Sequence, residues 1–346
     1  MQRMIPHSRP TLSKDDIDCV LAVLESGHIS QGKFVFEFEK RFAKYLDVKG
    51  ALVVNSGTSA LHLCFLALGI KEKDEVILST YQCSAVLNAI LYVGSRPKFA
   101  DIDADDFNIS FIDTKKKLTR KTKAIIVSHM FGSPVDILPF RKLGIPVIED
   151  CAQAIGAEYS GRKVGTFGDL SMTSFYTTKL LTTGEGGMVF SNNLSLLDKV
   201  RDLRDYDKKK SFKLRFNYKM TDIQAALGMS QLKKLDKFIN QRRYLARRYN
   251  KAFSNCDFDS PKSTKGHIYF RYVIRIKKDL RKALNFLKRN NVICERPVYK
   301  LLHKYLGQRS YPRAEAAWNS AVSIPIYPSL KPNEQKRVIE VIKKIC

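Results

Sequence analysis

One lysine of this chain stands in a setting unlike that of the others. Lys179 lies in the stretch SFYTTKLLTTGEGG, residues 174–187, between threonines and a glycine-rich turn. Small residues on both sides imply close packing, and a lysine in a partly desolvated pocket loses proton affinity. A larger neutral fraction of its amine can then attack a carbonyl carbon. The alternative is a solvated loop lysine, which we expect for nearly every other lysine here.

An acidic residue closes an apolar run earlier in the chain. Asp150 follows PVIE in the segment PVIEDCAQAIGA. It falls at the carboxyl end of an expected strand, where open α/β sheets bind their ligands. A partly desolvated carboxylate needs a cationic partner, such as the protonated ring nitrogen of a cofactor. The alternative is an aspartate that caps the next helix.

The segment NSGTSALHL has the form of an anion-binding turn. An expected strand ends at Asn55, Gly57 permits close backbone approach, and a helix begins near Thr58. The free N–H groups and positive dipole end of such a helix suit a phosphate. An ordinary strand-to-helix turn with a capping Ser or Thr fits the segment equally well. Taken together, a phosphate seat, a buried carboxylate and an activated amine are what pyridoxal 5′-phosphate requires.

The elements around these residues predict an α/β fold. Short β-rich runs alternate with helical patterns in the first half, which is typical of a mostly parallel sheet. We expect strands at residues 50–56, 74–80, 98–102, 123–130, 145–151, 169–176 and 187–192, with helices at 59–70 and 84–94. All three candidate sites then fall at strand ends.

The pattern changes to a long helical period from residue 219. Apolar residues recur at helical spacing, and Thr221 with Gln224 forms a capping-box signature. A strand at 267–276 and helices at 279–290 and 333–346 follow. We predict a large domain over residues 1–244 and a smaller C-terminal α/β domain over 245–346, with about the first 30 residues packing on the smaller domain.

Composition narrows the class of protein. The formal charge is +26, which is compatible with nucleic acid, an anionic membrane surface or acidic substrates. The basic residues are dispersed and form no arginine–aromatic array, which argues for solvated faces and against nucleic-acid binding. Arg215 and the run Lys208–Lys210 are candidates for steering an anionic substrate, or else solvated loop charge.

Cysteine and histidine usage points to the cytoplasm and to no structural metal. The seven cysteines are scattered without a CxxC pair, and the six histidines do not gather at metal-ligand spacing. The N-terminus has no apolar run typical of a secretory signal. The sequence also has no apolar stretch long enough to suggest a membrane span.

The ordered series of motifs resembles the DegT/DnrJ/EryC1/StrS aminotransferases, which are fold type I pyridoxal-phosphate enzymes. The similarity extends from HISQGKFVFEFEKRFAKYL through NSGTSALHL, KAIIVSHMFG, PVIEDCAQAIGA and SFYTTKLLTTGEGG to FNYKMTDIQAALG and SIPIYPSL. It covers nearly the whole chain. The resemblance implies a large domain with a mostly parallel sheet and a smaller α/β domain.

The resemblance also implies roles for individual residues. Lys179 would form the Schiff base with pyridoxal phosphate and then shuttle protons, with pyridoxamine phosphate as the intermediate form. Asp150 would pair with the pyridine nitrogen, and Gln153 would lie near the phenolic oxygen of the ring. The phosphate would be held by Gly57, Thr58 and Ser174. Asn217 would reach the phosphate bound by the other subunit, so a homodimer with shared active sites is implied.

The implied activity is amino transfer to a keto sugar. A 3- or 4-keto hexose on a nucleoside diphosphate would be the acceptor and L-glutamate the donor. Cys83 stands where the family often has an aromatic residue on the cofactor face, with Tyr81 as a candidate substitute. The segment ERPVYKLLHKYLG replaces the family's commoner His-Tyr-Pro substrate segment. The alternatives are a lyase or dehydratase on the same scaffold and a DNA-binding regulator.

Overall fold

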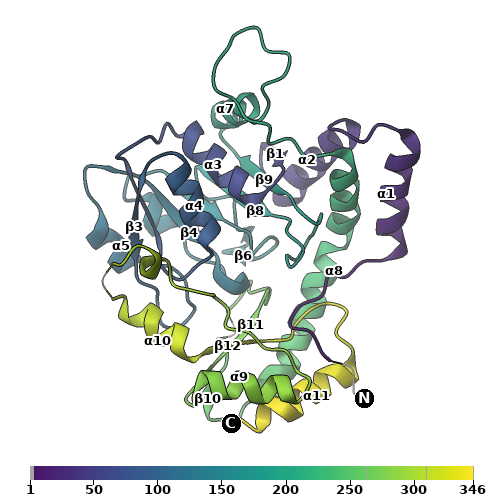
Figure 1. The fold of residues 1–346 in the computed structure, drawn as a ribbon, viewed down its shortest axis with the longest axis vertical. Helices are drawn as coiled ribbons and strands as arrows, with labels where there is room; N and C mark the ends of the chain where they lie inside the picture. The colour runs from purple at the N-terminus through teal and green to yellow at the C-terminus, as the bar shows by residue number, and fades with distance from the viewer. Residues whose placement is uncertain (1–3, 263, 309, 346) are drawn as a thin grey trace.

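A seven-stranded sheet forms the centre of the protein in a computed structural model, which describes residues 4–262, 264–308 and 310–345 (Figure 1). Strand β9 runs antiparallel to both of its neighbours, and the remaining pairs are parallel. The mostly parallel sheet predicted from the sequence is therefore confirmed. In spatial order the strands are β1 (Gly50–Val54), β9 (Gly187–Ser191), β8 (Leu170–Ser174), β5 (Val147–Asp150), β4 (Thr122–Ser128), β2 (Glu75–Ser79) and β3 (Arg96–Ala100).

Helices cover both faces of this sheet because its strands are apolar on both sides. Alternate residues of β1 belong to different cores: Leu52 and Val54 pack on one face, and Ala51 and Val53 on the other. Such two-sided burial is the mark of a central strand in an α/β fold. The first face is covered by α3 (Gly57–Ala67), α4 (Ser84–Tyr92) and α7 (Leu194–Arg204), and the second by α2 (Lys33–Leu46) and the start of α8 (Asp222–Ala252). The short helices α5 (Phe111–Lys117) and α6 (Leu138–Arg141) lie beside a further core.

A second, three-stranded sheet follows the long helix. It contains β10 (Phe258–Asp259), β11 (Tyr272–Ile276) and β12 (Ala321–Ile324), with α9 (Leu280–Arg289), α10 (Pro312–Ser320) and α11 (Pro332–Lys343) around it. A two-stranded hairpin of β6 (Glu158–Tyr159) and β7 (Arg162–Lys163) completes the strands of the described chain.

The strand expected over residues 267–276 begins only at Tyr272. The backbone before it hydrogen-bonds elsewhere: Ile268 N donates to Gly132 O at 3.0 Å, and Arg271 N donates to Phe131 O at 3.3 Å. These bonds tie the second sheet to the end of the first, which a sequence pattern does not reveal. The predicted capping box at Thr221 and Gln224 is present and begins α8.

The N-terminal residues contact the second sheet. Ile5 forms a bridge with Val292 and belongs to the core beneath that sheet, whereas α1 (Lys14–Ser26) packs along α8. Because α8 continues without interruption through residue 244, the domain boundary there stays a prediction.

Gly187 brings strand β9 into unusually close contact with the turn before α3. A Cβ atom built on this residue would lie 2.4 Å from Ser56 O and 2.8 Å from Gly57 N. Both neighbours are backbone atoms, which cannot turn aside as a side chain can. The GEGG stretch is therefore required by the close approach of β9 to the candidate phosphate seat.

We expect Gly187→Ala to destabilise the fold by about 1–3 kcal/mol, because it forces an added methyl group against fixed backbone. A lower midpoint of urea unfolding would show the effect. Gly50→Ala is the matched control on the neighbouring strand, where the added Cβ would meet the movable Leu197 Cδ1 at 2.8 Å. Equal unfolding midpoints for the two variants would contradict the explanation.

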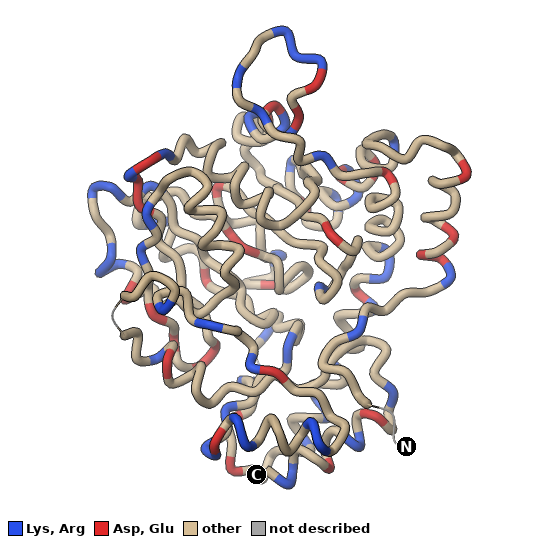
Figure 2. The backbone as a smooth tube through the Cα atoms, viewed as in Figure 1, with Lys and Arg blue, Asp and Glu red and all other residues tan. Residues whose placement is uncertain are grey.

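The basic residues are spread over the molecule, with a dense group on one protruding loop (Figure 2). This loop follows α7 and holds the exposed run Lys208–Lys210. Arg215 is not a free cation, because its Nε lies 3.0 Å from Asp202 Oδ1 and its side chain is mostly buried. Across the described residues, no helix is both long and apolar enough to cross a membrane.

Candidate active site

A cavity of about 250 Å³ lies at the carboxyl ends of the central strands. It collects almost all of the residues predicted from the sequence to hold the cofactor. The predicted residues that line it are Gly57, Thr58, Cys83, Asp150, Gln153, Ser174 and Lys179. The parallel strands explain this meeting, since their carboxyl ends share one edge of the sheet.

Lys179 lies in the turn between β8 and β9. Its backbone N–H donates to Tyr176 O at 2.8 Å, and its amine lies 5.5 Å from the centre of the Phe270 ring. Burial lowers the pKa of the Lys179 amine, an effect that the nearby Asp150 carboxylate partly opposes. The amine is therefore easier to deprotonate than that of a solvated lysine, as a nucleophile or a general base requires.

Asp150 is the last residue of β5, and its carboxylate is held from two sides. Oδ1 accepts a hydrogen bond from Ala152 N at 2.9 Å, and Oδ2 lies 3.1 Å from Ser128 Oγ at the end of β4. No ion pair to this carboxylate is found among the residues that the structure describes. A protonated ring nitrogen in the cavity would supply the missing cation.

The turn at Ser56 leaves two N–H groups free at the start of α3. Ser56 accepts hydrogen bonds from the N–H groups that follow. Its Oγ accepts from Ser59 N at 3.0 Å, and its carbonyl oxygen accepts from Ala60 N at 3.1 Å. The N–H groups of Gly57 and Thr58 precede these and have no intrahelical acceptor. A Cβ on Gly57 would lie 2.8 Å from Ser174 Cβ, so only glycine lets these segments converge.

Gln82 provides an independent test of whether a polar ligand fits. Its side chain is buried, lines the cavity, and has no hydrogen-bond partner for Nε2. Its Oε1 accepts from Ser128 Oγ at 2.7 Å. Whichever way the amide is turned, Ser128 can satisfy one end only, so one polar atom is left for a ligand. The cavity thus fits a polar group that the protein does not itself provide.

Gln153 and Cys83 both line this cavity, whereas Tyr81 does not. Gln153 Oε1 accepts from Phe131 N at 3.0 Å, which leaves its NH₂ group for a ligand. Cys83 is exposed and precedes α4 at the cavity wall. Tyr81 is fully buried in a separate aromatic cluster with Phe107 and Phe131, so it cannot substitute for a stacking ring.

Asn217 is the one predicted cofactor residue that does not line the cavity. It is exposed near the base of the protruding loop, and its carbonyl accepts from Asn55 Nδ2 at 3.3 Å. The role predicted for it involves the other subunit of a dimer. Its position outside this chain's own cavity agrees with that role without testing it.

A buried cluster of His129, Glu149 and Cys151 has the composition of a metal site. The donor atoms of its histidine and glutamate are already engaged, however. Glu149 accepts from His129 Nε2 at 3.1 Å and from the backbone of Gly165, Phe167 and Gly168, while His129 Nδ1 accepts from Val135 N at 3.0 Å. Burial alone would raise the pKa of Glu149, but these hydrogen bonds lower it. We therefore interpret the cluster as a structural hydrogen-bond network next to Asp150.

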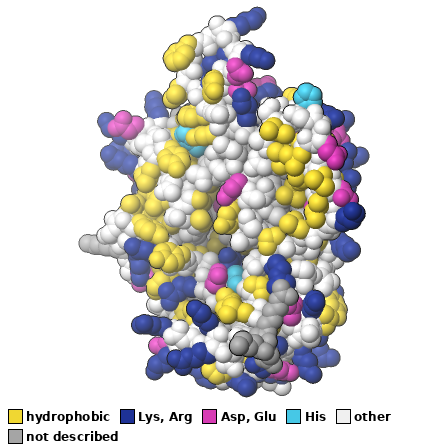
Figure 3. Space-filling model, turned by 45° about the vertical axis from the view of Figure 1, so that its right-hand side comes forward, with side chains coloured by type: hydrophobic (Ala, Val, Ile, Leu, Met, Phe, Trp, Pro, Cys, Tyr) yellow, Lys and Arg dark blue, Asp and Glu magenta, His cyan; other side chains and the backbone are white. Residues whose placement is uncertain are grey.

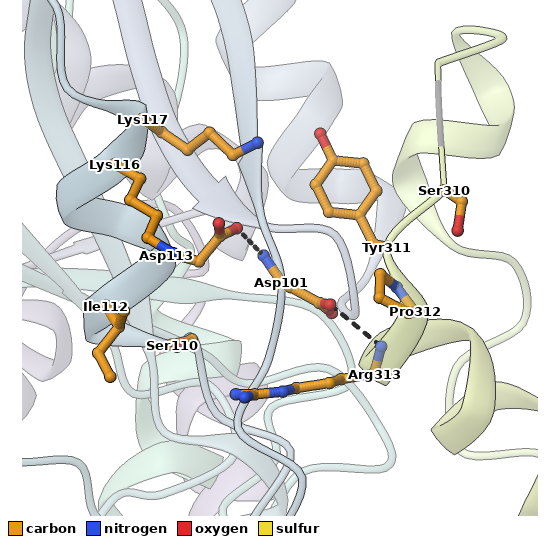
Figure 4. A pocket seen from close by; sticks show the side chains of 10 residues that line it. All are labelled: Asp101, Ser110, Ile112, Asp113, Lys116, Lys117, Ser310, Tyr311, Pro312 and Arg313. Atoms are coloured by element: carbon orange, nitrogen blue, oxygen red, sulfur yellow. Dashed lines mark hydrogen bonds between the residues drawn. The ribbon is translucent and has the colours of Figure 1, made fainter.

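A further cavity of about 320 Å³ lies beside β3, between α5 and the start of α10 (Figure 4). Lysines and Arg313 line it, but its polar groups serve the fold. The carboxylate of Asp101 accepts from Arg313 N at 3.0 Å and Ala314 N at 2.8 Å, which caps α10. The Arg313 guanidinium pairs with Asp103 at 3.3 Å. We therefore assign no chemistry to this cavity.

The sequence patterns did not single out Gln82, Ser128 or Arg271. Gln82 and Ser128 follow or end parallel strands, so the rule that ligands bind at strand ends could have found them. No sequence pattern pointed to Arg271, because it falls inside the segment that was predicted to be one continuous strand. Its position near Lys179 depends on how the two sheets meet.

Comparisons with known proteins agree with this geometry. The model of the DegT/DnrJ/EryC1/StrS aminotransferase family matches residues 10–343. The chain is 35% identical to the GDP-perosamine synthase of Vibrio cholerae, over 98% of each protein.

Solved structures are similar over the full length. PseC of Helicobacter pylori, an aminotransferase involved in the biosynthesis of pseudoaminic acid, has a TM-score of 0.94 and 28% identity over 99% of both chains. The PLP form of the "putative sugar aminotransferase Spr1654" from Streptococcus pneumoniae has a TM-score of 0.93 and 26% identity, covering 99% of this chain and 98% of that one. The protein described here is an enzyme that belongs to the DegT/DnrJ/EryC1/StrS aminotransferase family.

Proposed function

We propose that this enzyme transfers an amino group from L-glutamate to a keto sugar. The acceptor is a hexose with a keto group at carbon 3 or 4, carried on a nucleoside diphosphate. The names of the relatives support this choice, since one makes a GDP-linked amino sugar and another is a sugar aminotransferase solved with PLP. The observation that carries the proposal is the convergence of Lys179, Asp150 and the Gly57 turn on one cavity.

Each functional group of pyridoxal phosphate would have a matching residue in the cavity. The N–H groups of Gly57 and Thr58, with Ser174 beside them, would hold the phosphate. Asp150 would face the ring nitrogen, and the NH₂ group of Gln153 would face the phenolic oxygen. Lys179 would be the point of covalent attachment. When bound, the cofactor supplies an electron sink for the carbanion that forms at the donor's α-carbon.

The chain itself supplies the proton transfers. With cofactor and donor bound, Lys179 Nζ would remove the proton from the donor's α-carbon and, as an ammonium group, would deliver a proton to C4′ of the cofactor. Its pKa is lowered by burial, so the neutral base is available nearer to physiological pH than for an exposed lysine. The same amine serves the sugar half of the reaction in reverse.

We also propose a homodimer whose two subunits complete each other's sites. Apolar side chains are exposed on the protruding loop and on α1. On the loop, Phe212 and Leu214 are largely exposed to solvent, and on α1 the exposed side chains are Ile17, Leu21 and Leu24. Figure 3 shows hydrophobic side chains on the loop and on the face turned forward. Exposed apolar side chains gathered in this way favour association. Asn217 at the loop base would then reach the partner's phosphate seat.

Incubation of the purified holoenzyme with L-glutamate and a panel of keto nucleotide sugars tests the function. We expect the cofactor absorbance to change with glutamate alone and to return when the accepted sugar is added, with an amino sugar as product. Release of pyruvate or ammonia without an amino sugar would instead indicate a lyase or dehydratase. No spectral change with any amino acid would overturn the proposal.

A further inference from the structure

Arg271 lies near Lys179 and has no direct acidic partner. Both side chains approach the Phe270 ring: Lys179 Nζ lies 5.5 Å and Arg271 Cζ 5.7 Å from its centre. Arg271 borders a cavity of about 230 Å³, and Met130 lines both this cavity and the one that contains Lys179. The two cavities therefore adjoin at Met130, and Arg271 lines the second of them.

The charge of Arg271 is compensated only at a distance. Within the described chain, no carboxylate lies within ion-pair distance of its guanidinium. Its Nη1 lies 3.4 Å from His7 Nε2, within hydrogen-bond distance, and His7 Nδ1 lies 3.3 Å from Glu295 Oε2. Burial and the Arg271 charge lower the pKa of His7 to about 3, so a neutral imidazole separates the cation from the acid.

The other basic groups that line this second cavity are not available to a ligand in the same way. Lys262 Nζ pairs with Asp105 Oδ2 at 2.7 Å. His267 Nδ1 accepts from Tyr269 N at 2.8 Å, and burial lowers the pKa of its ring to about 3. Arg271 is thus the cation here that lacks a direct counter-charge. A half-buried guanidinium in this state is stabilised when a ligand brings an anion to it.

We propose that Arg271 binds the α-carboxylate of the amino donor. This inference rests on the proposed function, since it assumes an amino acid that reacts at Lys179. In such a donor the carboxylate is attached to the same carbon as the amine, so it must lie close to the place of Lys179 Nζ. The planar fork of arginine matches a carboxylate with two parallel hydrogen bonds. A sugar diphosphate is the other anion of the reaction, but it lies further from the reacting carbon.

The test compares L-glutamate with 4-aminobutyrate, which is glutamate without its α-carboxylate. We expect Arg271→Gln to lower kcat/KM for glutamate about 10- to 100-fold, the usual cost of losing charge-assisted hydrogen bonds. The value for 4-aminobutyrate should stay within a few-fold, so the preference for glutamate collapses. Arg271→Lys keeps the charge without the fork, and its preference should fall between those of the wild type and Arg271→Gln.

A binding measurement without turnover accompanies the kinetics. Titration with α-methyl-L-glutamate, which has no α-proton to lose, should show a dissociation constant raised about 10- to 100-fold in Arg271→Gln. Arg275→Gln is the matched control: it lies on β11, four residues after Arg271, and its Nε pairs with Asp259 Oδ2 at 3.3 Å. The control should bind the analogue as the wild type does. Melting temperatures of all variants show whether the fold is retained.

The outcomes separate this assignment from the function itself. An unchanged donor preference in Arg271→Gln, with a raised KM for the keto nucleotide sugar, would assign the guanidinium to the diphosphate and overturn the proposal. An unchanged preference with no effect on either substrate would also overturn it. If the wild-type enzyme accepts an amino group from neither donor, the proposed function and this assignment fall together.

Discussion

Lys179→Ala is expected to lower kcat by about 10⁴-fold or more, because it removes the proposed general base together with the proposed point of cofactor attachment. The fold should persist. Among the described residues no hydrogen bond to the Lys179 amine is found, and the turn is held by backbone contacts such as Lys179 N to Tyr176 O at 2.8 Å. The measurement is the steady-state rate of amino transfer, alongside the melting temperature.

Lys123→Ala is the matched control, since this lysine is exposed near the start of β4 and does not line the cavity. Its rate should equal that of the wild type. Borohydride reduction of the holoenzyme followed by peptide mapping should place the added cofactor mass on the peptide that contains residue 179. A near-normal transaminase rate for Lys179→Ala, or an unmodified peptide, would refute the role of this lysine.

Asp150→Asn should lower kcat by about 10²- to 10³-fold, the range found when one well-placed charge-stabilising group is removed from an active site. The amide matches the carboxylate in shape and can still accept from Ala152 N, now at 2.9 Å from Oδ1. What it cannot do is hold a proton on the ring nitrogen by its negative charge. The loss should therefore appear in the rate and in the absorbance of the bound cofactor, with little change in stability.

Asp169→Asn separates this effect from the general loss of a partly buried acid. Asp169 precedes β8 at the opposite end of the sheet, where its Oδ2 accepts from Val147 N at 2.8 Å. We expect this variant to keep its kcat while its melting temperature falls. A kcat for Asp150→Asn within threefold of the wild type would show that the carboxylate does not face the ring.

The central sheet and most of the cavity were predictable from the sequence, because both depend on local patterns. Continuous apolar runs that end in Asp150 or Asn55 mark buried parallel strands, and the sheet then brings those ends together. The family resemblance added the roles of Gln153 and Ser174. The turn glycines were also informative, since Gly187 is explained by its close contact with Ser56 O.

The features that were missed depend on contacts between distant segments. Tyr81 lies two residues before Cys83, yet it turns into the aromatic cluster of Phe107 and Phe131, which proximity in sequence could not show. Arg271 alternates with apolar residues as in an ordinary strand. Its lack of an acid partner is visible only once His7, from the other end of the chain, is seen between it and Glu295.

The uninterrupted course of α8 limits how the two sheets can move. This helix runs for 31 residues, and its buried side chains contact the cores of both sheets. Because the two sheets share this continuous helix, the chain has no flexible linker here about which the sheets could rotate apart. Under the proposed function, the amino donor and the keto sugar would bind one after the other in the same nearly rigid cavity. Selection between the two substrates should then depend on side-chain rearrangements. Crystals soaked with either substrate should remain intact.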